Sequence, residues 1–184
     1  YGDHRDLHRV DRRQRQMCIR DSHYGVTSQF YVLQRQPRGP AATNWRERLG
    51  QALRRANRSP VLGYVGLRFQ GHHAHISTFA IHPAWRRRGL GTFLLVATLE
   101  KAQRQGARRV TLEVRSSNHA AQRLYARAGF LRTGMCRAYY QDGEDAWLMA
   151  LGPLDESACL RLRRLRQEAE ARLMTCAGSS APGR

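Results

Sequence analysis

Lysine is almost absent from this chain of 184 residues: Lys101 is the single lysine among 32 lysine and arginine residues. Acidic residues are also few, 14 in all, so the formal net charge is +18. Proteins that bind nucleic-acid phosphates use both lysine and arginine. A bias toward arginine alone is more simply explained by a genome whose base composition favours arginine codons. We therefore do not predict nucleic acid as a partner, although so positive a surface attracts anionic ligands.

Paired cysteines, long apolar segments and metal-ligand spacings are absent as well. The cysteines Cys18, Cys136, Cys159 and Cys176 form no C-x-x-C pair and no zinc spacing, so we expect free thiols in a cytoplasmic protein. No run of about 18 apolar residues exists, which excludes a membrane-spanning helix, and no apolar signal-peptide segment is present. The histidines of "QGHHAHI" (70–76) lack a nearby cysteine or carboxylate. We predict a polar hairpin tip there, and no metal site.

The ends of the chain differ from its centre. Residues 1–22 are charged and aperiodic, and "MCIRDS" (17–22) resembles a translated transposon end from a sequencing library. We therefore predict that residues 1–22 are foreign to the fold or disordered. Residues 23–153 are expected to form one domain. Residues 154–184 are expected to form a basic amphipathic helix, which packs on the domain or is solvated, followed by a disordered tail.

Hydrophobic periodicity in the centre predicts alternating strands and helices. Alternation and β-branched residues indicate strands, and apolar residues three or four apart indicate helices. The predicted order is a strand at 28–36, a helix at 44–59, strands at 61–69 and 74–82, a helix at 89–105, a strand at 108–115, a helix at 118–128 and a hairpin at 138–151. Such an order is typical of a mixed α/β domain.

The stretch "WRRRGLG" (85–91) lies between the strand at 74–82 and the helix at 89–105. The first turn of a helix leaves backbone N–H groups unpaired, and the helix dipole favours an anion there. Glycines let the backbone come close to a ligand. The spacing matches neither the dinucleotide-binding fingerprint nor a Walker A loop. We therefore predict an anion site suited to phosphate.

Two residues of "LEVRSSNHAAQRLYARAGF" (112–130) could carry chemistry. Glu113 faces away from the apolar positions Leu112 and Val114 of its strand. Tyr125 lies on the apolar stripe of the next helix. Taken alone, Glu113 could equally be an exposed strand carboxylate, and Tyr125 could be a core tyrosine.

Taken together, the stretches R-x-x-G-x-G (86–91), L-E-V-R (112–115) and L-Y-x-x-x-G-F (124–130) resemble the GNAT acetyltransferases. Among these they look most like the ribosomal-protein-alanine N-acetyltransferases of the RimI type. The resemblance covers about residues 60–151. It implies the acyl-CoA N-acyltransferase fold, a mixed α/β sheet, here without its first strand and helices.

The resemblance also implies the co-substrate and the site. Acetyl-CoA would be the acetyl donor, with its pyrophosphate on the loop and its pantetheine arm along the preceding strand, and no metal would take part. The implied cofactor-binding residues are Phe79, Ala80, Ile81, Arg86, Arg87, Arg88, Gly89, Leu90, Gly91, Thr92 and Asn118. Glu113 matches the general base, acting directly or through water, and Tyr125 matches the acid that protonates the leaving thiolate.

The predicted acceptor is a protein N-terminal α-amine, and the family resemblance favours the N-terminal alanine of a small-subunit ribosomal protein. Two alternatives stay open. The first is a GNAT enzyme that acetylates a lysine side chain or a small-molecule amine. The second is a basic RNA- or ribosome-binding module without catalysis, whose affinity would fall steeply with salt.

Overall fold

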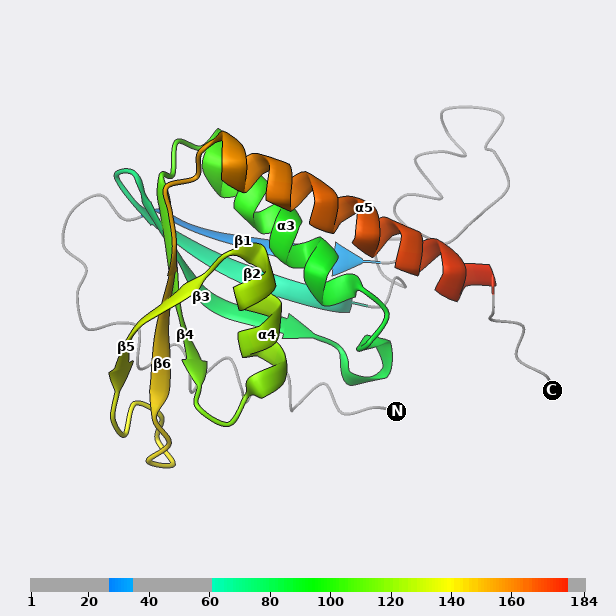
Figure 1. Cartoon of the computed structure of the whole chain (residues 1–184). Helices are drawn as coiled ribbons and strands as arrows, with labels where there is room; N and C mark the ends of the chain where they lie inside the picture. Colours follow the sequence, from blue (N-terminus) through cyan, green and yellow to red (C-terminus); the bar gives the residue numbers. More distant parts are fainter. Residues whose placement is uncertain (1–26, 35–60, 179–184) are drawn as a thin grey trace, which may run out of the picture.

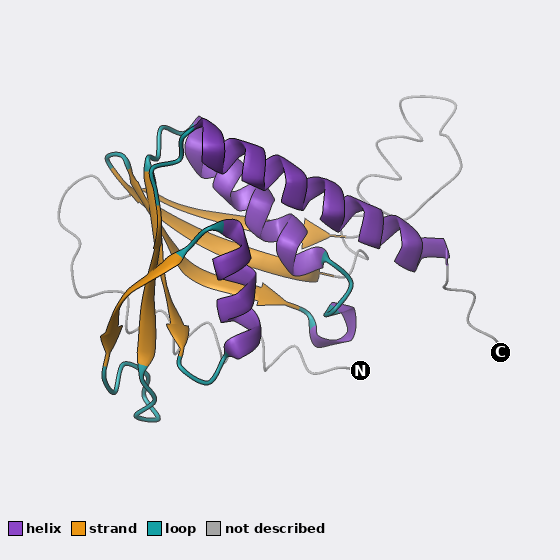
Figure 2. Cartoon of the chain, viewed as in Figure 1, coloured by secondary structure: helices purple, strands orange, loops and turns teal. Residues whose placement is uncertain are grey.

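The computed structural model describes residues 27–34 and 61–178. Within these residues a single twisted sheet carries helices packed against it (Figures 1 and 2). Three expectations lie outside the described residues. They are the foreign segment at 1–22, the helix at 44–59 and the lack of the family's first strand and helices. The predicted disordered tail lies outside the described residues from residue 179 onward.

The sheet has six described strands in the order β1-β2-β3-β4-β6-β5. β3 and β4 are parallel, and every other neighbouring pair is antiparallel. The prediction of a mixed α/β fold is therefore confirmed. The strand bounds are β1 Thr27–Gln34, β2 Val61–Gln70, β3 His73–Ile81, β4 Arg109–Arg115, β5 Leu131–Cys136 and β6 Ala146–Leu151.

The helices begin and end at the residues that the sequence marks. Gly106, with φ of 86°, follows the last turn of α3, and Gly129, with φ of 102°, caps α4. Asn118 caps the start of α4 by accepting a hydrogen bond from the backbone N–H of Ala121. Asp155 accepts from the N–H of Ala158 at the start of α5. The bounds are η1 Pro83–Trp85, α3 Leu90–Arg104, α4 His119–Ala128 and α5 Glu156–Gly178.

The core lies between one face of the sheet and the helices α3 and α4. The alternating residues Val110, Leu112 and Val114 of β4 are all buried, as are Val65 and Leu67 of β2. Because side chains alternate across a strand, this pattern leaves Glu113 on the opposite face of the sheet. The predicted direction of Glu113 is therefore confirmed.

Helix α3 is buried on two sides. One side faces the sheet, and the other faces α5, which lies along it (Figure 1). Leu95 and Val96, outside the single apolar face that the sequence predicts, are also buried, whereas Phe93 is half-buried with the guanidinium of Arg166 of α5 5.4 Å from its ring centroid. The predicted C-terminal helix thus packs on the domain. None of the described helices combines the length and the apolarity needed to cross a membrane.

The last hairpin differs from the prediction. Its first strand is Leu131–Cys136 rather than the residues just after 138, and residues 137–145 form the connecting loop with a turn at Tyr140–Gly143. The sequence signals this strand poorly, because β5 is an edge strand of the described sheet that begins with three exposed residues and has no fully buried residue.

Candidate active site

β3 and β4 separate at the middle of β3. Only residues His73–Ile76 of β3 pair with residues Arg109–Leu112 of β4. Beyond this stretch β3 continues to Ile81 and β4 to Arg115 without pairing with each other. The register with β2 shifts at the same place, which leaves Ser77 as an extra residue in β3. Such a bulge bends a strand and increases its twist. Figure 1 shows the two strands diverging, so the β4-facing edge of Phe79–Ile81 has no strand partner among the described residues.

The start of α3 lies directly after this open edge. Gly89 is the N-cap residue, no side chain caps the helix, and no acidic residue lies in its first turn. The first N–H groups and the positive end of the helix dipole are therefore available to an anion. The guanidinium of Arg86 donates to the carbonyl of Ile81 at 3.1 Å, and that of Arg88 lies 4.9 Å from the ring centroid of Trp85.

The two glycines of this loop also have packing roles. Gly89 has φ of 89°, and a Cβ there would lie 3.2 Å from the carbonyl oxygen of Ala169 on α5. A Cβ at Gly91 would lie 3.5 Å from Leu124 on α4. The absent side chains thus face protein. From the sequence we expected these glycines only to let the backbone come close to a ligand. The sequence does not show that α5 packs against this loop.

Glu113 is the first residue of β4 beyond the stretch paired with β3. Its carboxylate lies 3.2 Å from Nε2 of His75, and the two side chains are 22% and 23% exposed respectively. Nδ1 of His75 and Nε2 of His73 both hydrogen-bond the hydroxyl of Thr111, at 3.1 and 2.8 Å. His73 and His75 therefore belong to the strand, and only His72 lies in the predicted hairpin tip. Among the described residues, no three His, Cys, Asp or Glu side chains are grouped to hold a metal ion.

Tyr125 lies on the other face of the sheet, in the core, where it is 6% exposed. Its ring packs edge-on against Phe79, at 6.1 Å, and against Phe130. Burial, with a smaller effect of Tyr140, raises the pKa of the Tyr125 hydroxyl, which therefore stays protonated at neutral pH. No fully buried side-chain oxygen or nitrogen lacks a partner in the described part of the chain.

Tyr140 interacts electrostatically with both predicted catalytic residues, Glu113 and Tyr125. Burial raises the pKa of Tyr140 to about 12; Arg115 opposes this rise, and nearby carboxylates that include Glu113 add to it. The guanidinium of Arg115 lies 3.9 Å from the centroid of its ring. The sequence analysis placed Tyr140 in a strand and so missed it. Its signal was the turn at Asp142 and Gly143, which indicates a loop at the end of β4.

An ion-pair cluster holds this loop. Nη1 of Arg115 donates to Asp142 at 2.8 Å and to Glu144 at 2.6 Å. Glu144 also accepts a hydrogen bond from the backbone N–H of Ser117 at 2.9 Å. The loop between β5 and β6 is thereby fastened to the end of β4, beside Glu113.

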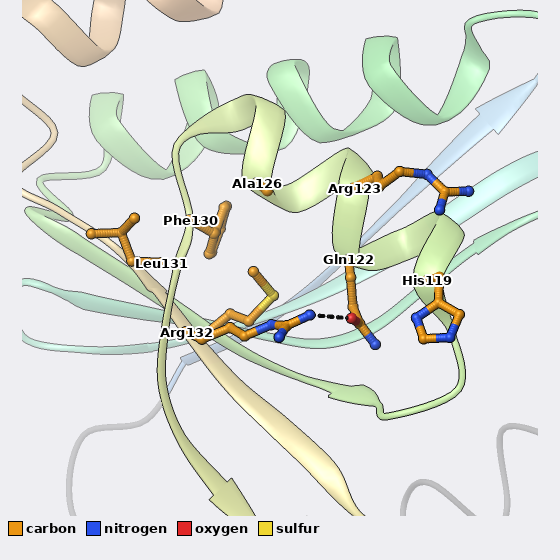
Figure 3. A pocket seen from close by; sticks show the side chains of 8 residues that line it. His119, Gln122, Arg123, Ala126, Phe130, Leu131 and Arg132 are labelled. Atoms are coloured by element: carbon orange, nitrogen blue, oxygen red, sulfur yellow. Dashed lines mark hydrogen bonds between the residues drawn. The ribbon is translucent and has the colours of Figure 1, made fainter.

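A cavity of about 580 Å³ lies between α4, β5 and β6. Figure 3 shows Arg132 of β5 pointing to Gln122 of α4, to whose side-chain oxygen it donates at 2.7 Å. None of the predicted site residues lines this cavity, and its two central polar side chains are already paired. We assign no ligand to it.

Known proteins are similar to part of this chain in sequence and in fold. An N-alpha-acetyltransferase of Sulfurisphaera tokodaii is 46% identical over 78 residues, which are 41% of this chain and 46% of that protein. The [ribosomal protein bS18]-alanine N-acetyltransferase of Escherichia coli is 41% identical over 81 residues, 42% of this chain and 55% of that protein. Among solved structures, Ard1 of Thermoplasma volcanium has a TM-score of 0.50 and 34% identity, covering 52% of this chain and 65% of that one.

The chain spans about half the length of the curated relatives it matches. The family match itself extends over residues 19–130, which is more than half of the chain. The resemblance expected from the R-x-x-G-x-G and L-E-V-R stretches is therefore confirmed. By this match, and by the mixed sheet with its separated central strands, the chain belongs to the acetyltransferase (GNAT) family.

Proposed function

We propose that the protein is an acetyl-CoA-dependent N-acetyltransferase that acts on a protein N-terminal α-amine, with the N-terminal alanine of a small-subunit ribosomal protein as acceptor. The observation that carries this proposal is the separation of β3 and β4 just before Glu113, beside the uncapped start of α3. The open edge of β3 runs into the uncapped start of α3, Glu113 follows the last residue of β4 that pairs with β3, and Tyr125 packs against Phe79 of the open edge. The names of the two relatives support the choice of acceptor.

The proposed cofactor site uses the open edge and the loop. Backbone groups of Phe79, Ala80 and Ile81 would pair with the amides of the pantetheine arm, as a further strand would. The N–H groups at the start of α3 would bind the pyrophosphate. The residues proposed for the phosphates are Arg86, Arg87, Arg88, Gly89, Leu90, Gly91 and Thr92. Asn118, whose side-chain oxygen caps α4, is proposed as a further contact.

The proposed chemistry is direct transfer. A free α-amine has a pKa of about 7.7–8.0, so most of it is protonated at neutral pH and must lose a proton before it attacks. Glu113 would take that proton. Acetyl-CoA supplies the thioester; the amine nitrogen bonds to its carbonyl carbon, the C–S bond breaks, and Tyr125 would give its proton to the departing sulfur. The raised pKa of Tyr125 keeps its hydroxyl protonated at neutral pH, so the proton is present when the C–S bond breaks.

Two conservative variants test these roles. We expect Glu113→Gln and Tyr125→Phe each to lower kcat by about 10²–10⁴-fold, because each removes one positioned proton transfer. The affinity for acetyl-CoA, measured by calorimetry, should stay close to that of the wild type, because neither side chain is proposed to hold the cofactor. Wild-type turnover in both variants would contradict the assignment.

The acceptor is tested with a pair of peptides. One carries a free N-terminal alanine, and the other is the same sequence with a blocked N-terminus and an internal lysine. We expect CoA release only with the first. Transfer to the second alone would favour side-chain acetylation, and salt-sensitive RNA binding without any transfer would favour the non-catalytic alternative.

A further inference from the structure

On the face of the sheet opposite the core, Glu113 lies at one end of a chain of side chains that can each exchange a proton. The proposed function does not use the other members of this chain. Glu113 meets Nε2 of His75, Nδ1 of His75 meets the hydroxyl of Thr111, and that hydroxyl meets Nε2 of His73. Every link is between 2.8 and 3.2 Å. These distances are within hydrogen-bonding range, so the four side chains form one continuous hydrogen-bonded chain.

The fold explains why they meet. β3 and β4 are parallel neighbours here, with His75 opposite Thr111 and His73 opposite Arg109. Side chains two residues apart lie on the same face of a strand, so both histidines project to the same side of the sheet as Thr111 and Glu113. The chain of groups ends where the paired part of the two strands ends, directly at Glu113.

We propose that His75, Thr111 and His73 form the outlet by which Glu113 returns the acceptor's proton to solvent. This inference rests on the proposed function, because it concerns the base of that reaction. His75 and Thr111 act through Glu113 and are positioning residues.

The transfers balance without any co-reactant. The acceptor N–H bond breaks, and the proton binds a carboxylate oxygen of Glu113. That proton passes to Nε2 of His75 while the Nδ1 proton of His75 passes to the oxygen of Thr111. The hydroxyl proton of Thr111 passes to Nε2 of His73, which releases a proton to water. An imidazole and a hydroxyl can each both donate and accept, so each group can hand on one proton as it receives another.

Burial and charge favour an outlet in this direction. The side chains of Glu113 and His75 are only 22% and 23% exposed, whereas Gly71 and His72, in the turn next to His73, are exposed. Burial first, and then His75 and Arg109, lower the pKa of His73, so it releases a proton rather than retaining it. Other charged or titratable groups on this face, among the described residues, include Arg68, the β2 partner of His75, Arg109 and Arg115 of β4, and Tyr140, which interacts with Glu113 from the loop.

The test uses the full chain, acetyl-CoA and the alanine peptide. General acid–base groups contribute about 10²–10⁴-fold; because Glu113 remains, we expect a smaller loss of kcat in His75→Ala, about 10-fold, with an unchanged KM for acetyl-CoA. Added imidazole should restore the rate in proportion to its neutral form, which a purely structural defect would not allow. Thr111→Val should also lower kcat, and its solvent isotope effect should be larger than that of the wild type.

The matched control is His72→Gln, an exposed histidine that bonds the carbonyl of Gly106 outside this chain of groups. It should turn over as the wild type does. Full activity of His75→Ala, or a loss that imidazole does not restore in a variant of unchanged melting temperature, overturns the outlet. If His75→Ala fails to fold, wild-type kcat in Thr111→Val overturns it. A wild-type chain that transfers no acetyl group overturns the proposed function, and the outlet with it.

Discussion

At Gly89, the N-cap residue of α3, the loop before that helix meets α5. The φ of 89° at Gly89 is unfavourable for any residue with a Cβ, and that Cβ would press on the carbonyl of Ala169. A left-handed conformation alone costs about 1–2 kcal/mol. We expect Gly89→Ala to lower the free energy of unfolding by at least about that amount, measured by urea denaturation.

Gly143 offers the control for this prediction. It has φ of 81°, and a Cβ there would meet nothing within 4 Å. Gly143→Ala therefore carries the backbone strain without the contact and should destabilise less than Gly89→Ala. Equal losses in the two variants would mean that α5 does not press on Gly89.

Glu144 makes the fold sensitive to acid. Hydrogen bonds from Ser117, and then from Arg115, lower the pKa of Glu144 from 4.5 to about 2. A carboxyl whose pKa is lower in the folded chain stabilises the fold above its unfolded pKa and loses that contribution as the pH falls through the folded pKa. Over the window from about pH 4.5 to pH 2, the wild type should therefore lose more stability than Glu144→Gln. If the two proteins lost the same free energy of unfolding across this window, the stabilising role given to ionised Glu144 would be wrong.

Helix α5 is an integral layer of the domain. Leu162 is 1% exposed and belongs to the core cluster, whereas Leu160 on the same helix is 58% exposed. Truncating a fully buried leucine removes its burial and leaves a cavity, at a cost of about 2–5 kcal/mol. We expect that loss for Leu162→Ala and a change within about 0.5 kcal/mol for Leu160→Ala, by urea denaturation of the full chain. Similar small effects in both would indicate that α5 is solvated rather than packed.

Binding of the proposed co-substrate is expected to stabilise the molecule as a whole. A ligand at 100 times its dissociation constant stabilises the folded state by about 2.7 kcal/mol. For a domain of this size, each kcal/mol raises the melting temperature by about 2–4 °C. Thermal unfolding with acetyl-CoA present should therefore move upward by several degrees, and Glu113→Gln should respond equally. A cooperative transition without such a shift would argue against acetyl-CoA binding by this chain.

Sequence patterns predicted the elements that bury one clear face. β4 alternates Val110, Leu112 and Val114, and α4 has both its Asn118 cap and its Gly129 stop; each lies where the pattern placed it. They also predicted an anion site at the loop before α3, which stays a prediction. They failed at β5, an edge strand with little to bury, and along the second face of α3, because burial there depends on α5.

Local sequence by itself determined the mixed order of strands and helices, the direction of Glu113 and the family motifs, because periodicity and capping act over a few neighbouring residues. Only the tertiary structure decided that β3 leaves β4 after Ile76, that His75 reaches Glu113, and that α5 closes on Gly89. These contacts join residues far apart in the chain. They depend on strand register and on the packing of whole elements, which no local pattern records.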